Sequence, residues 1–278
     1  MKTADLITHS HPPATAEAAE VAVAVAREAG WRLVADSDGI EGELPPGVEP
    51  AGAGESPELC LVLGGDGSIL RALRRYAGTG VPVFGVNFGT VGFLAAVERG
   101  EAAAGIGRAF AGETETVELP GLEVAFDGEK RLGFNDIALA RRPQDRVAEL
   151  TYSIAGEEVG HVRCDGLVAA TPAGSTGYNL ANQGPILAWG VKGYVVSYIS
   201  PHSLTARALV VAPGDVLHVG NAEAREPVEV LVDGEQIGEL APGAGIEVRF
   251  VDAAGRLAQL PGSSFYQRIR EKFGHLAV

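Results

Sequence analysis

The stretch "LVLGGDGSILRALRR", Leu61–Arg75, decides the fold because it carries a buried strand, a glycine turn and the start of a helix. Within residues 58–63, "ELCLVL", the apolar residues follow one another without a break, which is typical of a parallel strand buried on both faces. Residues 68–77 place two kinds of side chain on opposite sides of a helical pattern: Ile69, Leu70 and Leu73 against Arg71, Arg74 and Arg75. The segment therefore predicts a strand-turn-helix unit of an α/β domain.

The residues on either side continue this alternation of strands and helices. Strands are predicted over 4–9, 31–36 and 81–86, and a helix over 14–30. Residues 37–56 are rich in Gly, Pro and Glu and show no periodicity, so they predict a loop. This order implies a parallel sheet with helices on its faces.

After about Thr116 the pattern changes to short strands separated by Gly, Asp and Pro turns. Two strands joined at Asp127 and Gly128 are predicted within 122–134, and another pair within 148–171. Five further segments continue the series: 193–200, 208–213, 215–220, 227–240 and 245–251. Such a series predicts a mainly antiparallel β domain.

The segment 263–275 predicts an amphipathic helix that begins at a serine cap and packs back on the first domain. The predicted organisation is an α/β domain over 1–115, joined by the C-terminal helix of 262–278, and a β-rich domain over 116–261. With 46% hydrophobic residues among 278, the chain can bury a core in each domain.

Composition and charge narrow the class of protein. The net charge of −14 argues against a nucleic-acid binder, which normally carries a basic excess. No apolar run reaches the length of a membrane span, and residues 1–10 lack the basic and apolar regions of a signal peptide. Cys60 and Cys164 lie in apolar runs and are predicted to be buried, reduced thiols. We therefore expect a cytoplasmic protein that binds neither nucleic acid nor a membrane.

The glycine loop Gly64–Ser68 carries an acid, Asp66, at its centre. Loops between a buried strand and a helix often bind phosphate through their backbone N–H groups. The spacing here differs from the dinucleotide fingerprint G-x-G-x-x-G and from the P-loop, which requires Gly-Lys-Ser/Thr. A carboxylate beside phosphates can hold Mg²⁺ or accept a proton from an attacking hydroxyl, the two roles that phosphoryl transfer needs. A plain Asp-Gly turn is the alternative for this loop alone.

A second constellation, "DGLVAATPAGSTGYNLANQGPIL" at Asp165–Leu187, gathers hydroxyl groups, small residues and one aromatic ring, which suit an adenine and a ribose better than a simple turn. It resembles the T-P-T-G-S-T-A-Y signature of NAD kinases. The glycine loop resembles the Gly-Gly-Asp-Gly loop that these enzymes share with phosphofructokinases and lipid kinases. Four further segments resemble NAD kinase segments in the expected order: 86–95, 133–139, 201–211 and 232–236. The resemblance covers residues 58–275.

This sequence departs from the family pattern at several positions. Asn135 is followed by Asp136, where the family usually carries Glu. Ala173 and Gly177 replace the common Thr and Ala, and Ser68 ends the glycine loop in place of Thr. These changes leave the implied fold and reaction class unchanged.

The resemblance also implies a role for each matching residue. Asp66 would be the catalytic base toward the 2′-hydroxyl of the adenosine ribose of NAD. In the α/β domain the implied nucleotide-binding residues are Gly65, Gly67 and Arg71, with Arg71 facing phosphate. In the β-rich domain, which would bind NAD, they are Asn135, Asp136, Arg146, Arg163, Asp165, Ala173, Ser175, Thr176, Gly177, Tyr178, Asn179, Ala181, Asp233 and Glu235.

Within this set, Asp165 would contact the nicotinamide end, with Arg146 and Arg163 nearby as partners for anions. Tyr178 and its neighbours would shape the adenine pocket. The resemblance assigns no metal ligand, although Mg²⁺ or another divalent ion is expected with the donor, ATP or polyphosphate.

The family implies a homodimer or homotetramer whose neighbouring subunits complete the site. Two alternatives remain beside a kinase that makes NADP from NAD. The first is an NAD(P)-dependent oxidoreductase, against which the missing G-x-G-x-x-G counts. The second is a catalytically silent nucleotide sensor, against which Asp66 and the intact glycines count.

Overall fold

The computed structural model describes residues 1–8, 12–36, 43–52, 54–222 and 226–274. Part of the predicted loop, 37–42, and the last residues of the C-terminal segment, 275–278, lie outside the described residues. The chain divides into two compact units. One is formed by Met1–Glu118 together with Gly255–Val278, and the other by Leu119–Ala254, so the first unit is discontinuous in sequence.

The first unit is built on a parallel sheet. Its strands are β1 (Lys2–Thr8), β2 (Trp31–Ala35), β3 (Glu49–Pro50), β4 (Leu59–Gly64), β5 (Pro82–Asn87), β6 (Val97–Glu98) and the end of β18 (Gly245–Gln259). They lie in the order β18-β5-β4-β1-β2-β3, and β6 pairs with β5. Each of these pairings is parallel, which confirms the predicted α/β arrangement.

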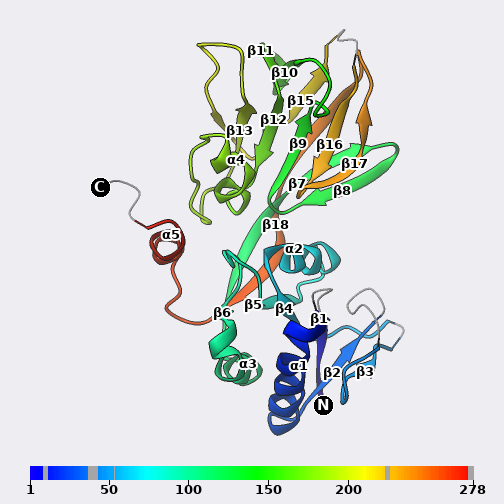
Figure 1. The fold of residues 1–278 in the computed structure, drawn as a ribbon, viewed down its shortest axis with the longest axis vertical. Coiled ribbons are helices and arrows are strands. Elements are labelled where there is room, and N and C mark those ends of the chain that lie inside the picture. The colour runs from blue at the N-terminus through cyan, green and yellow to red at the C-terminus, as the bar shows by residue number, and fades with distance from the viewer. Residues whose placement is uncertain (9–11, 37–42, 53, 223–225, 275–278) are drawn as a thin grey trace. The chain divides into compact units, whose positions relative to one another are not determined.

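Within the described residues, three helices contact this sheet: α1 (Pro12–Glu28), α2 (Asp66–Arg75) and α3 (Ala102–Phe110), which follows a 3₁₀ turn at Arg99–Glu101 (Figure 1). A fourth helix, α5 (Phe265–Phe273), packs its rings on Phe93. Helix α2 buries its predicted apolar side, Ile69, Leu70 and Leu73, and contacts β4 and β5. A Cβ atom on Gly85 would lie 2.4 Å from Cδ1 of Ile69, so this glycine permits the close approach of α2 to β5.

The second unit is mainly antiparallel. Its strands are β7 (Glu115–Phe126), which begins in the first unit, β8 (Glu129–Gly133), β9 (Asp136–Ala140), β10 (Ala148–Ile154), β11 (Glu157–Cys164), β12 (Gly166–Ala170), β13 (Tyr194–Ile199), β14 (Leu209–Val211), β15 (Leu217–Asn221), β16 (Val228–Val232), β17 (Glu235–Leu240) and the start of β18. One sheet has the order β14-β13-β12-β9-β16-β17, and a second run of strands has the order β11-β10-β15-β18. All pairings within these two runs are antiparallel, as predicted.

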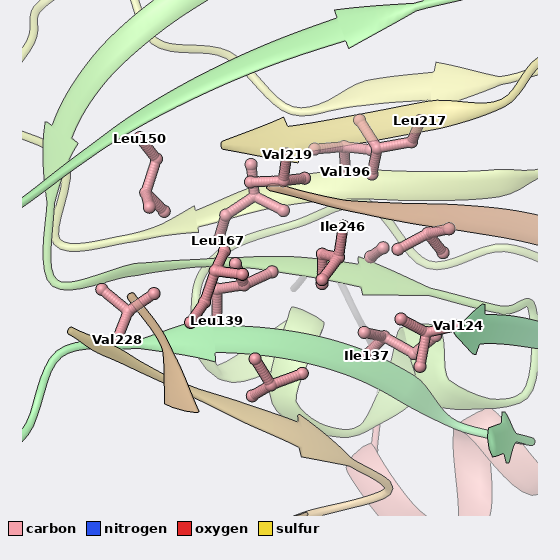
Figure 2. Close-up of a cluster of buried hydrophobic side chains, with 14 of the residues drawn as sticks. Val124, Ile137, Leu139, Leu150, Leu167, Val196, Leu217, Val219, Val228 and Ile246 are labelled. Carbon is pink, nitrogen blue, oxygen red and sulfur yellow. The ribbon is translucent and has the colours of Figure 1, made fainter. Parts of the chain in front are cut away.

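Side chains from both runs of strands form one apolar core in this unit. Figure 2 shows Leu139 and Leu167 from one sheet among Leu150, Val219 and Ile246 from the other. Strand β16 alternates buried and less buried positions because it turns one face to this core, whereas β12 is buried along its whole length. Packing in this core holds the strands in place, and the loops of the second unit begin at the ends of these strands.

Two further expectations concern the cysteines and membrane segments. Cys60 and Cys164 are free and buried, as predicted. Burial raises the pKa of the Cys164 thiol to about 12 and raises that of Cys60 well above its usual value. Across the described ranges, no helix has the length and apolar character needed to cross a membrane.

Candidate functional site

The glycine loop lies at the carboxyl end of β4, where the chain turns into α2. Gly65 precedes the helix, and its carbonyl accepts hydrogen bonds from the N–H groups of Ser68 and Ile69, at 3.0 and 3.2 Å. The loop that follows β5 approaches it closely, since a Cβ atom on Gly89 would lie 3.0 Å from Cα of Gly65. The two loops follow adjacent parallel strands at the edge where α/β sheets bind their ligands.

Asp66 is the first residue of α2, and both of its carboxylate oxygens have partners. Oδ2 accepts the N–H of Phe93 at 2.8 Å, and Oδ1 accepts the N–H of Leu94 at 2.9 Å. The side chain is half-buried. Each carboxylate oxygen has a second lone pair, so the group can still accept a hydrogen bond from a ligand. Asp66 thus joins the glycine loop to a segment 27 residues further along the chain.

The other predicted residues of the first unit lie beside this carboxylate. Gly67 is exposed, and a Cβ atom on it would meet nothing within 4 Å, which leaves the adjacent backbone open to a ligand. Arg71 is exposed, and its Nη2 donates to the carbonyl of Thr8 at 3.2 Å. Thr8 ends β1, so this contact brings the Arg71 guanidinium to the same edge of the sheet.

Asn87 is a further polar residue of this edge to which no role is predicted from the sequence. It is buried at the end of β5, where its Oδ1 accepts the N–H of Gly89 and its Nδ2 donates to Glu98, both at 2.9 Å. A Cβ atom on Gly92 would lie 2.2 Å from the Asn87 amide nitrogen. Asn87 therefore shapes the loop that precedes Phe93.

In the second unit, the segment Phe134–Asp136 is held by Asp233. Oδ1 of Asp233 accepts the N–H groups of Asn135 and Asp136 at 2.7 and 3.2 Å, and Oδ2 accepts that of Phe134 at 3.1 Å. Asp233 lies in the turn between β16 and β17 with a φ of 50°. Its carboxylate therefore supports the backbone of two other predicted site residues. Glu235 begins β17 and is exposed.

Thr171 fixes the same segment from the other side. Its Oγ1 donates to the Phe134 carbonyl at 2.6 Å and accepts the N–H of Gly174 at 3.0 Å. A Cβ atom on Gly174 would lie 1.9 Å from the Asn135 carbonyl oxygen, so only glycine allows this contact. Thr171 is buried and is not among the predicted site residues, although it is the first Thr of the signature.

The side chains that follow divide into buried and exposed groups. Ser175 and Asn179 are fully buried and donate to backbone carbonyls of the protein: Ser175 to Pro172 at 2.7 Å, and Asn179 to Ser175 at 2.8 Å. Ala173 is buried, and Thr176 donates to its carbonyl at 3.0 Å. Gly177, Tyr178 and Ala181 are exposed around the short helix α4 (Tyr178–Ala181).

Ala181 also borders a cavity of about 460 Å³, together with Ser197, Ser200 and Arg207. The exposed side of α4 is thus the part of the signature that is open to a ligand.

Burial and charge alter the titration of Asp136. Only 5% of Asp136 is exposed, and this burial, assisted by the negative charge of Asp233, raises the pKa of its carboxyl to about 7. Burial also raises the pKa of Tyr178, and the charges of Asp136 and Asp165 add to that shift. Both carboxylates therefore lie within electrostatic range of the Tyr178 hydroxyl. A carboxyl that is protonated near neutral pH can donate a hydrogen bond to a ligand.

The arginine that pairs with Asp165 is Arg141, for which no role is predicted, whereas Arg146 and Arg163 are predicted as partners for ligand anions. Nε of Arg141 lies 2.5 Å from Oδ1 of Asp165, and this hydrogen bond lowers the pKa of the carboxyl. Arg163 instead pairs with Glu149 at 3.1 Å, and Arg146 is exposed and forms no ion pair with any residue that the structure describes. Arg141 follows β9 and Asp165 precedes β12, two paired strands, so only the strand register reveals the contact.

The comparisons with known proteins identify the family of this chain. The model of the "ATP-NAD kinase N-terminal domain" family matches residues 50–114, and that of the "ATP-NAD kinase C-terminal domain" family matches residues 134–259. An NAD kinase of Symbiobacterium thermophilum is 37% identical over 220 residues, 77% of this chain and 78% of its own. NAD kinase 2 of Streptomyces coelicolor is 33% identical over 284 residues, 98% of this chain and 94% of its own.

Solved structures share the fold. The crystal structure of yeast NADH kinase complexed with NADH has a TM-score of 0.87 at 22% identity, and covers 100% of this chain and 89% of its own. An NAD kinase from Archaeoglobus fulgidus in complex with ATP has a TM-score of 0.73 at 22% identity, and covers 98% and 97%. Since the family models match more than half of the chain and the relatives align over most of it, this protein belongs to the ATP-NAD kinase family and is a phosphotransferase.

Proposed function

We propose that this NAD kinase transfers the terminal phosphoryl group of ATP to the 2′-hydroxyl of the adenosine ribose of NAD, with Asp66 as the general base. The observation that supports this role most is the fixed carboxylate of Asp66, held at the start of α2 by the N–H groups of Phe93 and Leu94. A base held in one orientation within hydrogen-bond reach of a hydroxyl contributes about 10²–10⁴-fold to a rate.

The surroundings of Asp66 suit a phosphorylated donor. The start of α2 carries partial positive charge from its free N–H groups, and Gly67 leaves this backbone open. Arg71 adds a full positive charge one turn further along the helix. We assign to these groups the orientation of the donor phosphates, because phosphoryl transfer depends mainly on positioning and on neutralising charge.

In the second unit we assign NAD binding to the polar groups of Asn135 and Asp136 and to the exposed ring of Tyr178. The Tyr178 ring is 41% exposed and offers a face on which an adenine can stack. The backbone of Asn135 is fixed from both sides, by Asp233 and by Thr171, which orients its side chain for a hydrogen bond to the nucleotide. Asp136 can donate a further hydrogen bond while it is protonated. The buried Ser175 and Asn179 support this loop from inside.

The expected divalent ion is best explained as bound to the phosphates of the donor, ATP. No group of three His, Cys, Asp or Glu side chains suited to a metal is present in the described part of the chain. Mg²⁺ commonly keeps several waters and takes substrate phosphates as ligands, with few protein carboxylates. Mg–ATP is therefore the substrate that the residues present suit best. Its ion would offset negative charge on the phosphates, while Arg71 and the α2 N-terminus orient them.

The remaining features of the proposal rest on the family resemblance. We expect a cytoplasmic homodimer or homotetramer, with polyphosphate as an alternative donor. Light scattering coupled to gel filtration measures the subunit number, and parallel assays with ATP and polyphosphate measure the donor preference.

One incubation tests the central proposal. Purified protein, Mg–ATP and NAD are combined, and NADP is detected with an NADP-specific dehydrogenase. We expect NADP to accumulate with NAD as acceptor, and none to form with Asp66→Ala at the same protein concentration. An absence of NADP with wild-type protein that binds both nucleotides would refute the assignment.

A further inference from the structure

The short segment Phe93–Ala95 has its backbone groups bound from two opposite directions. Its N–H groups at Phe93 and Leu94 donate to Asp66. Its carbonyl groups accept from two residues near the C-terminus: those of Phe93 and Ala95 from Nη1 of Arg268, at 3.1 and 2.5 Å, and that of Leu94 from Nε2 of Gln259, at 3.0 Å. The segment is therefore a backbone bridge between Asp66 and the pair Gln259–Arg268.

One peptide group carries the direct connection. The carbonyl oxygen of Phe93 accepts from Arg268, and the N–H of Leu94, in the same peptide plane, donates to Asp66. A cation at the carbonyl end polarises the peptide and makes its N–H a stronger donor to the carboxylate at the other end. Arg268 thus acts on Asp66 through a single peptide, and no direct ion pair is needed.

The guanidinium is held firmly in this position. Arg268 is 8% exposed, Gln259 is 3% exposed, and Nη2 of Arg268 donates to Oε1 of Gln259. Helix α5, which carries Arg268, packs the rings of Phe265 and Phe273 on Phe93, with 5.9 Å between ring centroids in each pair. Burial lowers the pKa of Arg268, while the negative charge of Asp66 opposes that shift.

We propose that Arg268 is a positioning residue for phosphoryl transfer, which fixes the orientation of the Asp66 carboxylate through the Phe93–Leu94 peptide. The proposal rests on the function proposed above for Asp66. It gives a role in turnover to a helix that lies beyond residue 259, where the match to the family model ends. Loss of this orientation reduces the rate of the chemical step, because misplacement of a reacting group by about 1 Å can cost 10²-fold.

A purely structural role for Arg268 makes a different prediction. If Arg268 only stabilised the fold, its removal would lower the melting temperature and the fraction of folded enzyme, while each folded molecule kept its normal turnover. If it positions Asp66, turnover per folded molecule falls while the Michaelis constants for NAD and ATP stay close to those of the wild type. The split between kcat and KM therefore separates the two roles.

The experiment compares Arg268→Met, Arg268→Lys and Gln259→Met with Arg270→Met, an exposed arginine on the same helix. Calorimetric titration with NAD counts the binding-competent sites of each preparation, and kcat is expressed per site. For Arg268→Met we expect kcat per site to fall about tenfold or more, with both KM values within about threefold of wild type. Lys keeps a cation that can reach the Phe93 carbonyl, so Arg268→Lys should recover most of this loss, and Arg270→Met should match the wild type.

Gln259→Met covers the case in which Arg268→Met does not fold, since it frees the Leu94 carbonyl and removes one partner of Arg268. It should lower kcat per site by about threefold or more. A normal kcat per site in the folded member of this pair would overturn the proposal. Asp66→Ala is assayed beside them: if it keeps its turnover, the general-base assignment fails, whereas if it is inactive and the Arg268 variants are normal, only the positioning role fails.

Discussion

Asp233 and Asn135 stand 98 residues apart in the chain, yet the Asp233 carboxylate accepts the Asn135 N–H at 2.7 Å. The same carboxylate also accepts the N–H groups of Phe134 and Asp136. A turn residue of one hairpin thereby holds the entry to β9, the strand that begins at Asp136. Asp233 acts on the nucleotide site by shaping the backbone of its neighbours.

Asp233→Ala should therefore weaken both the fold of the second unit and NAD binding. Three backbone N–H groups lose their acceptor, which is expected to lower the free energy of unfolding by about 1–3 kcal/mol. The KM for NAD should rise, because Asn135 is no longer fixed. Urea unfolding and steady-state kinetics measure the two effects.

Asp127→Ala is a matched control for that substitution. Asp127 lies in the turn between β7 and β8 with a φ of 49°, close to the 50° of Asp233, and each is followed by a glycine with a φ of 80°. The backbone strain of alanine is thus the same at both sites. Equal losses of stability in the two variants would show that the three hydrogen bonds to Asp233 contribute nothing measurable.

Tyr178→Ala should raise the KM for NAD with little effect on folding, because the ring is 41% exposed. Stacking of an aromatic side chain on a base contributes about 1–3 kcal/mol, which corresponds to a rise of about fivefold or more. Tyr178→Phe keeps the ring and should bind NAD as the wild type does. An unchanged KM in the alanine variant would remove Tyr178 from the adenine site.

The buried carboxyl of Asp136 predicts a pH dependence of stability. Its pKa is raised from 3.8 to about 7 by burial, so between these values the folded state holds a proton that the unfolded state has lost. The free energy of unfolding should therefore fall as the pH rises through this window, by an amount on the order of 4 kcal/mol, and level off above it.

Asp136→Asn isolates this contribution, since asparagine keeps the shape and has no proton to lose. Urea unfolding of both proteins at about pH 4, 5.5 and 8 should show the variant gaining stability relative to the wild type as the pH rises. A constant difference between the two proteins across this range would contradict the raised pKa.

Asp66→Asn tests two roles of this carboxylate together: that of general base, and that of acceptor for the N–H groups of Phe93 and Leu94. A turn-forming aspartate tolerates asparagine, but here the amide NH₂ would face one of the two N–H donors of Phe93 and Leu94. We expect a melting temperature lowered by a few degrees, retained NAD binding and a turnover reduced about 10²-fold or more. Asp127→Asn, the same change in an exposed turn, should leave turnover unaltered. Turnover above about a tenth of the wild type would return Asp66 to a structural role.

The sequence predicted those strands and helices whose pattern of apolar and polar residues lies within the element itself. The unbroken apolar run that became β4 and the two-sided pattern of α2 are properties of neighbouring residues, and both were confirmed. Two-residue strands such as β3, which lies within the predicted loop 37–56, are too short to produce a pattern. Their existence depends on a neighbouring strand, here β2.

The site was predicted less completely because its contacts join distant segments. Arg141, Thr171 and Arg268 reach their partners through strand register or helix docking, which no spacing of residue types reveals. The signature also does not show which side chains are buried. Ser175 belongs to it and Asn179 follows it directly, but both side chains lie inside the loop that presents Tyr178.

The discontinuity of the first unit has a consequence for synthesis on the ribosome. Residues 255–274, which supply the last part of β18 and all of α5, follow the whole of the second unit in the chain. A nascent chain that has just completed residue 254 contains Asp66 and Phe93 but neither Gln259 nor Arg268. The carbonyl groups of Phe93–Ala95 then lack the hydrogen bonds that Gln259 and Arg268 donate. The segment that holds the Asp66 carboxylate therefore gains its full set of hydrogen bonds only after the whole of the second unit has been synthesised.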